Sequence, residues 1–330
     1  MTSDHPSSPV SGWSGRVDGT SSEHLRWHQA VRPADADDAA PGRSTAVVGF
    51  ASDEGVRRNA GRVGAVEGPA ALRGALSSLA FVDGTGALVD AGDVVVERGN
   101  EDAPGELEGG QEELAGRVAA LLDGHTLTVV LGGGHETAYA SYSGLARSRR
   151  VGPDTRIGIL NLDAHFDLRE APRPSSGTPF LQAARAEEAA GRELRYAVVG
   201  ISEANNTRVL FDTARELGAR WLTDEQSQTA DLPNVLRFVR EFVREVDVLY
   251  LTIDLDVLPA AVAPGVSAPA GFGVPYEVIH ACVLEATRSE KLVLADVVEL
   301  NPSLDVDGRT AKSAARLVHT IVTRHATPAG

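Results

Sequence analysis

Residues 157–169 place three metal-capable side chains directly behind an apolar run, and this stretch constrains the fold more than any other. The apolar run 157–160 is typical of a buried strand, and Asp163, His165 and Asp167 follow it at alternate positions. In an extended backbone, side chains two residues apart point to the same side of the strand. The stretch therefore predicts a strand whose end presents two carboxylates and an imidazole together. They are either metal ligands or polar residues that alternate by chance.

Strand-like and helix-like segments alternate along the rest of the chain. The predicted strands are 45–51, 88–96, 126–131, 157–160, 194–201, 220–222, 248–253 and 292–298. The predicted helices are 70–80, 111–122, 137–149, 180–190, 205–217, 235–246, 276–287 and 309–323, and the Gly- and Arg-rich segment 53–62 is predicted to be a loop. This alternation predicts an α/β fold, in which a mainly parallel sheet of about eight strands is covered by helices on both faces. Because crossovers between parallel strands are right-handed, one doubly wound domain is favoured over two small ones.

The chain divides into a leader and one domain. Residues 1–44 are rich in Ser, Pro, Asp and Ala, and we expect an N-terminal arm there without a clear strand. Trp13 and Trp27 are candidate anchors for this arm. Residues 45–330 contain no internal repeat and no linker-like change of composition, so we expect a single domain over this range.

Composition excludes several classes of function. The formal net charge of −15 argues against nucleic acid or an anionic membrane as a partner. Cys282 is the only cysteine, which rules out an intramolecular disulfide and a thiolate metal cluster. No window approaches the ~18 uninterrupted apolar residues of a membrane span. Residues 1–6 lack the basic start and apolar core of a signal peptide, so we expect a cytoplasmic protein.

Every candidate for chemistry lies at the carboxyl end of a predicted strand, where ligands bind in open parallel sheets. These candidates are His135, Asp163, His165, Asp167, Asp254, Asp256 and Glu299. Each has an ordinary explanation by itself, as a helix cap, a loop acid or the partner of an arginine. Four aspartates together would repel one another without cations, and two divalent metal ions carry the matching charge. Oxygen and imidazole ligands without thiolate favour Mn²⁺, and two such ions favour hydrolysis by a shared, ionised water.

Four short motifs resemble those of the ureohydrolase (arginase/agmatinase) superfamily in order and spacing. They are Gly-Gly-Gly-His-Glu at 132–136, Asp-Ala-His-Phe-Asp at 163–167, Asp-Leu-Asp at 254–256 and Glu-Leu-Asn-Pro at 299–302. Further segments are similar to one branch, the formimidoylglutamases of histidine degradation. These segments are 13–18, 26–28, 53–62, 134–136, 175–180 and 263–269, together with Phe166 and Arg169.

The resemblance implies a three-layer α/β/α fold and two Mn²⁺ ions per subunit. One ion would be held by His135, Asp163, Asp167 and Asp254, and the other by Asp163, His165, Asp254 and Asp256. The resemblance also implies hydrolysis of N-formimidoyl-L-glutamate to L-glutamate and formamide by a metal-bridging hydroxide. Related enzymes commonly form trimers or hexamers, so a homo-oligomer is expected.

The substrate side of the site is predicted from charge. Two substrate carboxylates need cationic donors, and Arg169, two residues beyond a metal ligand, is the leading candidate for a bidentate clamp. Glu299 would hold the imino nitrogen of the substrate. Arginases place a proton-shuttling histidine where this chain has Phe180. Proton transfer to the leaving nitrogen is therefore left to metal-bound water, to Asp167 or to another group, and of these Asp167 is the preferred candidate. The other candidates for substrate binding are Arg57, Arg58, Asn59, Arg62, Ser175 and Ser176, and for the arginines among them the alternative is solvated surface charge.

Three other functions remain open. A related amidino hydrolase would act on agmatine or another guanidino compound, but a cationic substrate favours acids over arginines near the mouth of the site. An inactive paralogue would serve as a binding subunit, although all six predicted metal ligands are present. A metal-dependent deacetylase on a related fold would keep fewer of these ligands.

Overall fold

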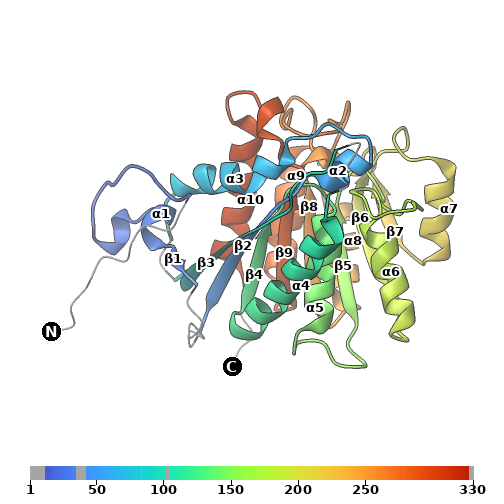
Figure 1. Cartoon of the computed structure of the whole chain (residues 1–330), viewed down its shortest axis with the longest axis horizontal. Coiled ribbons are helices and arrows are strands. Elements are labelled where there is room, and N and C mark those ends of the chain that lie inside the picture. The colour runs from blue at the N-terminus through green and yellow to red at the C-terminus, as the bar shows by residue number, and fades with distance from the viewer. Residues whose placement is uncertain (1–11, 35–41, 83, 101–104, 327–330) are drawn as a thin grey trace.

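One parallel sheet between two layers of helices forms the body of the protein (Figure 1). The computed structural model describes residues 12–34, 42–82, 84–100 and 105–326. Within this part of the chain, nine strands pair in the order β1-β3-β2-β4-β9-β8-β5-β6-β7, and every pairing is parallel. The strands are β1 (Arg32–Pro33), β2 (Ser44–Ala51), β3 (Ala87–Val95), β4 (Leu127–Leu131), β5 (Ile157–Leu162), β6 (Arg195–Ile201), β7 (Arg220–Thr223), β8 (Val248–Asp254) and β9 (Leu292–Val298). The predicted α/β fold is confirmed.

Helices cover both faces of the sheet (Figure 1). On one face lie α4 (Leu107–Gly124), α5 (Thr137–Arg147) and α6 (Pro179–Ala189), and on the other lie α3 (Gly68–Ser77), α8 (Leu232–Arg244), α9 (Tyr276–Thr287) and α10 (Arg309–Arg324). The shorter helices are α1 (Trp27–Ala30), α2 (Glu54–Arg58) and α7 (Arg208–Glu216), of which α7 flanks the edge strand β7. No helix among the described residues is both long and apolar enough to cross a membrane.

Two hydrophobic cores lie on opposite faces of the sheet. Successive residues along a strand alternate between them: Val47 and Leu160 belong to one core, and Val48 and Ile159 to the other. A parallel strand that is buried on both faces must be apolar at every position. This requirement is the reason that continuous apolar runs predicted the strands so well.

The prediction of a loop at 53–62 is wrong for its first half, which forms α2. Glu54, whose side chain is fully buried, accepts hydrogen bonds from Arg57 at 2.7 and 2.8 Å and from Arg58 at 2.9 Å. Ion pairs three and four residues apart stabilise a helical turn. A helix this short does not repeat apolar residues at helical spacing, so hydrophobic periodicity does not predict it from the sequence.

The described part of the N-terminal arm packs closely on the body. Trp27 is fully buried, and its indole N–H donates to Nδ1 of His319 on α10 at 3.1 Å. Trp13 donates to a carboxylate oxygen of Asp90 at 2.5 Å, and Arg73 binds the same carboxylate at 2.7 and 3.0 Å. The expectation that the arm contains no strand is wrong, because β1 pairs with β3. Residues 1–11 and 35–41 of the predicted arm lie outside the described residues.

Candidate metal centre

Three strands carry the predicted metal ligands to one edge of the sheet, and a fourth strand between them, β9, carries Glu299. The strands β4, β9, β8 and β5 are adjacent in this order, and the carboxyl ends of parallel strands meet at the same edge. His135 follows β4 after three glycines, and the 163–167 motif follows β5. Asp254 ends β8, and Asp256 lies in the single turn of 3₁₀ helix Leu255–Val257 that comes next. All six predicted ligands therefore meet above the middle of the sheet.

The first group of side chains surrounds Nδ1 of His135. This nitrogen lies 3.2 Å from a carboxylate oxygen of Asp163, 2.9 Å from one of Asp167 and 3.2 Å from one of Asp254. His135, Asp163 and Asp254 are almost completely inaccessible to solvent, and their ligand atoms lie within 4.8 Å of one another. Three acidic side chains thus converge on one ring nitrogen.

The second group shares Asp163 with the first. Nδ1 of His165 lies 3.0 Å from an oxygen of Asp256 and 3.6 Å from the second oxygen of Asp163. The backbone supports this arrangement, because the N–H of His165 donates to Asp163 at 2.7 Å and the N–H of Asp256 donates to Asp254 at 2.8 Å. Asp163 therefore bridges two adjacent groups of ligands, as a shared ligand of two ions would.

The chemistry of this cluster fits two divalent cations. Nδ1 of His135 is buried and has no hydrogen-bond partner among the described residues, although three carboxylates surround it. Burial, and then the carboxylates of Asp256 and Asp163, raise the pKa of Asp254 well above its usual range. A bound cation removes this repulsion and takes the lone pair of the ring nitrogen. Carboxylate oxygens and imidazole nitrogens without sulfur are the ligands that suit Mn²⁺.

Buried polar groups orient the ligands from behind. Nε2 of His135 lies 3.1 Å from the hydroxyl of Thr252 on β8. The side-chain amide of Asn161, at the end of β5, donates to Asp163 at 2.9 Å and also lies 2.9 Å from the hydroxyl of Tyr196. Such contacts fix the rotation of a ligand before the metal ion arrives.

Glu299 stands beside the cluster as a buried acid. One of its oxygens accepts the backbone N–H of His135 at 2.8 Å, and the other has no hydrogen-bond partner among the described residues. Burial, and then the nearby carboxylate of Glu136, raise the pKa of Glu299 to about 8. Burial also raises the pKa of Glu136 to about 7.

Two residues at this edge adopt a left-handed backbone that side chains other than glycine rarely take. Asp167 has φ = 49° and Glu299 has φ = 68°. Non-glycine residues held in this region store of order 1–3 kcal/mol of strain each and cluster at functional sites. The fold therefore holds Asp167 and Glu299 beside the cluster in backbone conformations that are unfavourable in free energy.

A cavity of about 400 Å³ opens above the metal-capable groups. Its lining residues are Asn59, Ala60, Gly61, Arg62, His135, His165, Asp167, Arg169, Ser176, Asp254, Asp256, Ser267, Ala268 and Glu299. Four of the seven predicted substrate-binding residues line it: Asn59, Arg62, Arg169 and Ser176. The cavity joins an acidic floor to a wall that carries two arginines.

The two arginines of the cavity differ in their partners. Arg62 donates to the carbonyl oxygens of Ser267 and Val266, each at 2.8 Å. The guanidinium of Arg169 is exposed and makes no hydrogen bond or ion pair with any described residue, while its backbone N–H donates to Gly177 at 2.9 Å. The whole guanidinium of Arg169 is therefore available to a ligand, whereas that of Arg62 is partly engaged.

The other three predicted substrate-binding residues do not reach this cavity. Arg57 and Arg58 both bind Glu54, and Arg58 also binds Glu108 at 2.8 and 2.9 Å. The hydroxyl of Ser175 is buried and lies 3.3 Å from the backbone N–H of Gly177, within the loop that follows β5. These contacts engage all three side chains within the protein, and their part in substrate binding stays a prediction.

Phe180 fills a packing position next to the cluster. Its ring meets the ring of His135 edge to face, with 5.3 Å between centroids, and stacks on Tyr196 at 4.6 Å. An apolar ring cannot transfer a proton, so Phe180 has a packing role at this position.

Sequence reasoning gave no role to several residues of the site. Ser267 and Ala268 of the 263–269 segment line the cavity, Glu136 of the 132–136 motif lies beside Glu299, and Thr252, which belongs to no motif, contacts His135. An acid within an apolar strand is a usable signal, and Asp296 in β9 is such a residue, completely buried.

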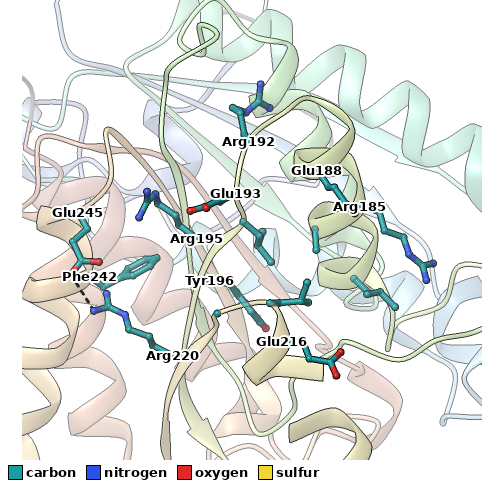
Figure 2. Close-up of a pocket in the computed structure, with 15 residues that line it drawn as sticks. Arg185, Glu188, Arg192, Glu193, Arg195, Tyr196, Glu216, Arg220, Phe242 and Glu245 are labelled. Carbon is teal, nitrogen blue, oxygen red and sulfur yellow. Dashed lines mark hydrogen bonds and ion pairs between the residues drawn. The ribbon is translucent and has the colours of Figure 1, made fainter. Parts of the chain in front are cut away.

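A second cavity, of about 640 Å³, lies at the opposite edge of the sheet (Figure 2). It opens at the amino ends of β6 and β7, near the ends of α6, α7 and α8. Four arginines and four glutamates line it, and Arg220 pairs with Glu245 at 3.2 Å. Neither group of metal-capable side chains in the described residues lies there, so the chemistry belongs to the first cavity.

Comparison with known proteins assigns the family. The model of the arginase family matches residues 43–323, which is most of the chain. The chain belongs to the arginase family. The formimidoylglutamase of Rhodococcus jostii is 56% identical over 316 residues, which cover 96% of each chain. That of Nocardia farcinica is 56% identical over 327 residues, covering 98% of this chain and 99% of the relative.

Solved structures of arginase-family proteins share the fold of this chain. The formimidoylglutamase of Bacillus subtilis superimposes with a TM-score of 0.78 at 22% identity, over 97% of each chain. The formiminoglutamase of Trypanosoma cruzi with Mn²⁺ gives a TM-score of 0.73 at 24% identity, over 85% of this chain and 93% of that chain. The sequence-based resemblance to arginases and agmatinases is therefore confirmed at the level of family and fold.

Proposed function

We propose that this arginase-family enzyme hydrolyses N-formimidoyl-L-glutamate to L-glutamate and formamide with two Mn²⁺ ions. The observation that carries the proposal is the unpaired guanidinium of Arg169 in the wall of the cavity above the acidic cluster. A cation there suits a substrate with carboxylates and repels a cationic one. The close relatives named formimidoylglutamase support the same substrate.

The six clustered residues would hold the ions. His135, Asp163, Asp167 and Asp254 would bind one, and Asp163, His165, Asp254 and Asp256 the other. When bound, the two ions would lower the pKa of a water so that it is ionised near neutral pH, and they would offset the negative charge of the clustered carboxylates.

The remaining residues of the cavity would bind and orient the substrate. The guanidinium of Arg169 presents two parallel donors to one substrate carboxylate, and Arg62, which keeps an unused guanidinium N–H₂ group, would face the other. The free carboxylate oxygen of Glu299 would accept an N–H of the formimino group. These contacts would bring the formimino carbon above the acidic cluster.

Hydrolysis breaks the bond between the formimino carbon and the nitrogen of glutamate. The oxygen of water joins the carbon, which leaves as formamide, and a proton joins the departing glutamate nitrogen. Asp167 would deliver that proton, since it lines the cavity and Phe180 cannot.

A guanidino hydrolase is the nearest alternative, and an inactive binding subunit is the alternative from another class. A cationic substrate such as agmatine would meet Arg169 and Arg62 at the mouth of the cavity, which disfavours it. We also propose that the enzyme assembles as a homo-oligomer and works in the cytoplasm.

The test is a product analysis with protein reconstituted with Mn²⁺. Formimidoylglutamate, agmatine and guanidinobutyrate are supplied separately, and formamide, ammonia and urea are quantified. Formamide and glutamate in equal amounts, with little urea from the guanidino compounds, are expected. Ammonia with N-formylglutamate would mean cleavage at the other C–N bond, and urea from agmatine would favour the alternative. No turnover and no bound Mn²⁺ would favour the inactive subunit.

A further inference from the structure

The ring of His135 is held between the metal-capable cluster and a buried hydroxyl. Nδ1 faces three carboxylates, and Nε2 lies 3.1 Å from the hydroxyl oxygen of Thr252. Thr252 is fully buried in β8. A neutral imidazole carries its proton on only one nitrogen, and only the unprotonated nitrogen can bind a metal ion. His135 can bind a metal ion through Nδ1 only if its proton lies on Nε2, and this requires the Thr252 hydroxyl to accept the hydrogen bond and donate its own proton elsewhere.

The acceptor available to Thr252 is a carboxylate on the next strand. Thr252 of β8 pairs in register with Asp296 of β9, which is also fully buried. One oxygen of Asp296 accepts a hydrogen bond from Ser141 at 2.8 Å and another from the hydroxyl of Tyr250. The second oxygen has no hydrogen-bond partner among the described residues, and the Thr252 side chain interacts with this carboxylate from the neighbouring strand. Tyr250 and Thr252 are two residues apart on β8, so their side chains point to the same face of the sheet.

The numbers of donors and acceptors link the direction of the Thr252 hydrogen bond to the tautomer of His135. An ionised carboxylate only accepts, and a threonine hydroxyl has a single proton to donate. If Thr252 donates that proton to Asp296, its oxygen accepts from Nε2–H of His135. The proton of the imidazole then lies on Nε2, and the lone pair of Nδ1 points into the cluster.

We propose that Asp296 and Thr252 form a relay that sets the tautomer of His135 and so raises the affinity of the site for Mn²⁺. The relay deepens the proposed function and rests on its metal centre. Asp296 and Thr252 are positioning residues, because neither lines the cavity where substrate would bind.

The place of Asp296 supports a functional purpose. It is the one charged residue of β9, between apolar neighbours Ala295 and Val297, and its side chain is shielded completely from water. Burying a carboxylate costs several kcal/mol unless hydrogen bonds compensate, and an apolar residue of similar size would favour folding. Three hydroxyl groups instead gather around this acid, and one of them leads to a predicted metal ligand.

Four substitutions test the relay. Thr252→Val removes the hydroxyl at nearly constant volume, and Thr252→Ser retains it. Asp296→Asn keeps the shape of the side chain but lets an amide N–H donate to Thr252, which then donates to Nε2 and forces the proton onto Nδ1. The matched control is Thr128→Val, since Thr128 on β4 is equally buried and its hydroxyl has no hydrogen-bond partner among the described residues.

The affinity of each metal-free protein for Mn²⁺ is measured by calorimetry and chelator competition, beside its thermal unfolding. Loss of a hydrogen bond behind a metal ligand typically weakens metal binding about 10- to 100-fold. We expect this loss for Thr252→Val and Asp296→Asn, whereas Thr252→Ser and Thr128→Val bind like the unsubstituted chain. Turnover of Thr252→Val should recover at high Mn²⁺ concentration, because the relay acts through affinity.

Two results would overturn the relay alone. One is Mn²⁺ binding by Thr252→Val that matches the unsubstituted chain, and the other is equal weakening in Thr252→Val, Thr252→Ser and Thr128→Val, which would indicate a packing effect. If Asp296→Asn does not fold, the comparison of valine with serine at position 252 decides the question. An unsubstituted chain that binds no Mn²⁺ would overturn the proposed metal centre, and the relay with it.

Discussion

Removal of the Arg169 side chain isolates the substrate contact from the metal centre. The guanidinium is exposed and has no partner among the described residues, so Arg169→Ala breaks no interaction that stabilises the fold. A hydrogen bond to a charged group contributes about 1.5–3 kcal/mol. Since 1.4 kcal/mol corresponds to a factor of ten, we expect kcat/KM for formimidoylglutamate to fall roughly 10- to 150-fold.

The assay follows formamide release over a range of substrate concentrations. A contact made equally in the ground state and the transition state changes KM and leaves kcat intact, so we expect most of the loss in KM. Arg169→Lys should retain only part of the activity. The ammonium group keeps the positive charge, but it cannot bind a carboxylate with two parallel donors. Arg173→Ala is the matched control, since Arg173 lies in the same loop but does not line the metal cavity.

Two outcomes would refute this assignment. An unchanged kcat/KM in Arg169→Ala would exclude Arg169 from substrate binding. A parallel loss of bound Mn²⁺, measured by metal analysis of the same sample, would show that the substitution acts through the metal centre. Equal losses in Arg169→Ala and Arg173→Ala would point to the general charge of the loop.

Three further predictions follow from other parts of the structure. A Cβ at Gly177 would lie 2.7 Å from Cδ of Arg169, so Gly177→Ala should displace that side chain and raise KM in steady-state kinetics without loss of Mn²⁺. Chelation of the metal should lower the melting temperature, because a ligand at a hundred times its Kd stabilises the folded state by about 2.7 kcal/mol; an unchanged melting curve would contradict a cluster held together by cations. The hydrogen bond from Arg57 lowers the pKa of Glu54 to about 2, so its stabilisation is complete above the ordinary value of 4.5 and is lost as pH falls toward 2. Denaturant titrations should therefore show Glu54→Gln less stable than the unsubstituted chain at pH 7, with the difference shrinking from pH 4.5 to 2; a constant difference would exclude this linkage.

Local patterns predicted the sheet and the metal-capable residues because both depend on short stretches of chain. The apolar runs of β8 and β9 and the alternating ligands after β5 can be read without knowledge of the fold. The ends of parallel strands then collect the ligands at one edge, whatever the order of the strands.

Contacts between distant segments were not predictable in this way. Arg58 and Arg169 are equally basic in sequence, yet Arg58 is held by Glu54 and Glu108 whereas Arg169 is free in the cavity. The pairing of Thr252 with Asp296 depends on the register between β8 and β9, which no local pattern specifies.

The order of strands in the sheet determines when the metal centre can come into existence. β4 and β5 follow each other along the chain, but β9 and β8 lie between them in the sheet. A growing polypeptide emerges from its amino end, so β1 to β4 and β5 to β7 are both made before the two strands that join them. β9, which ends at Val298, must therefore be synthesised before the sheet can close and bring His135 close to Asp163. Capture of metal ions is thus confined to the last stage of biogenesis, when nearly the whole chain is available.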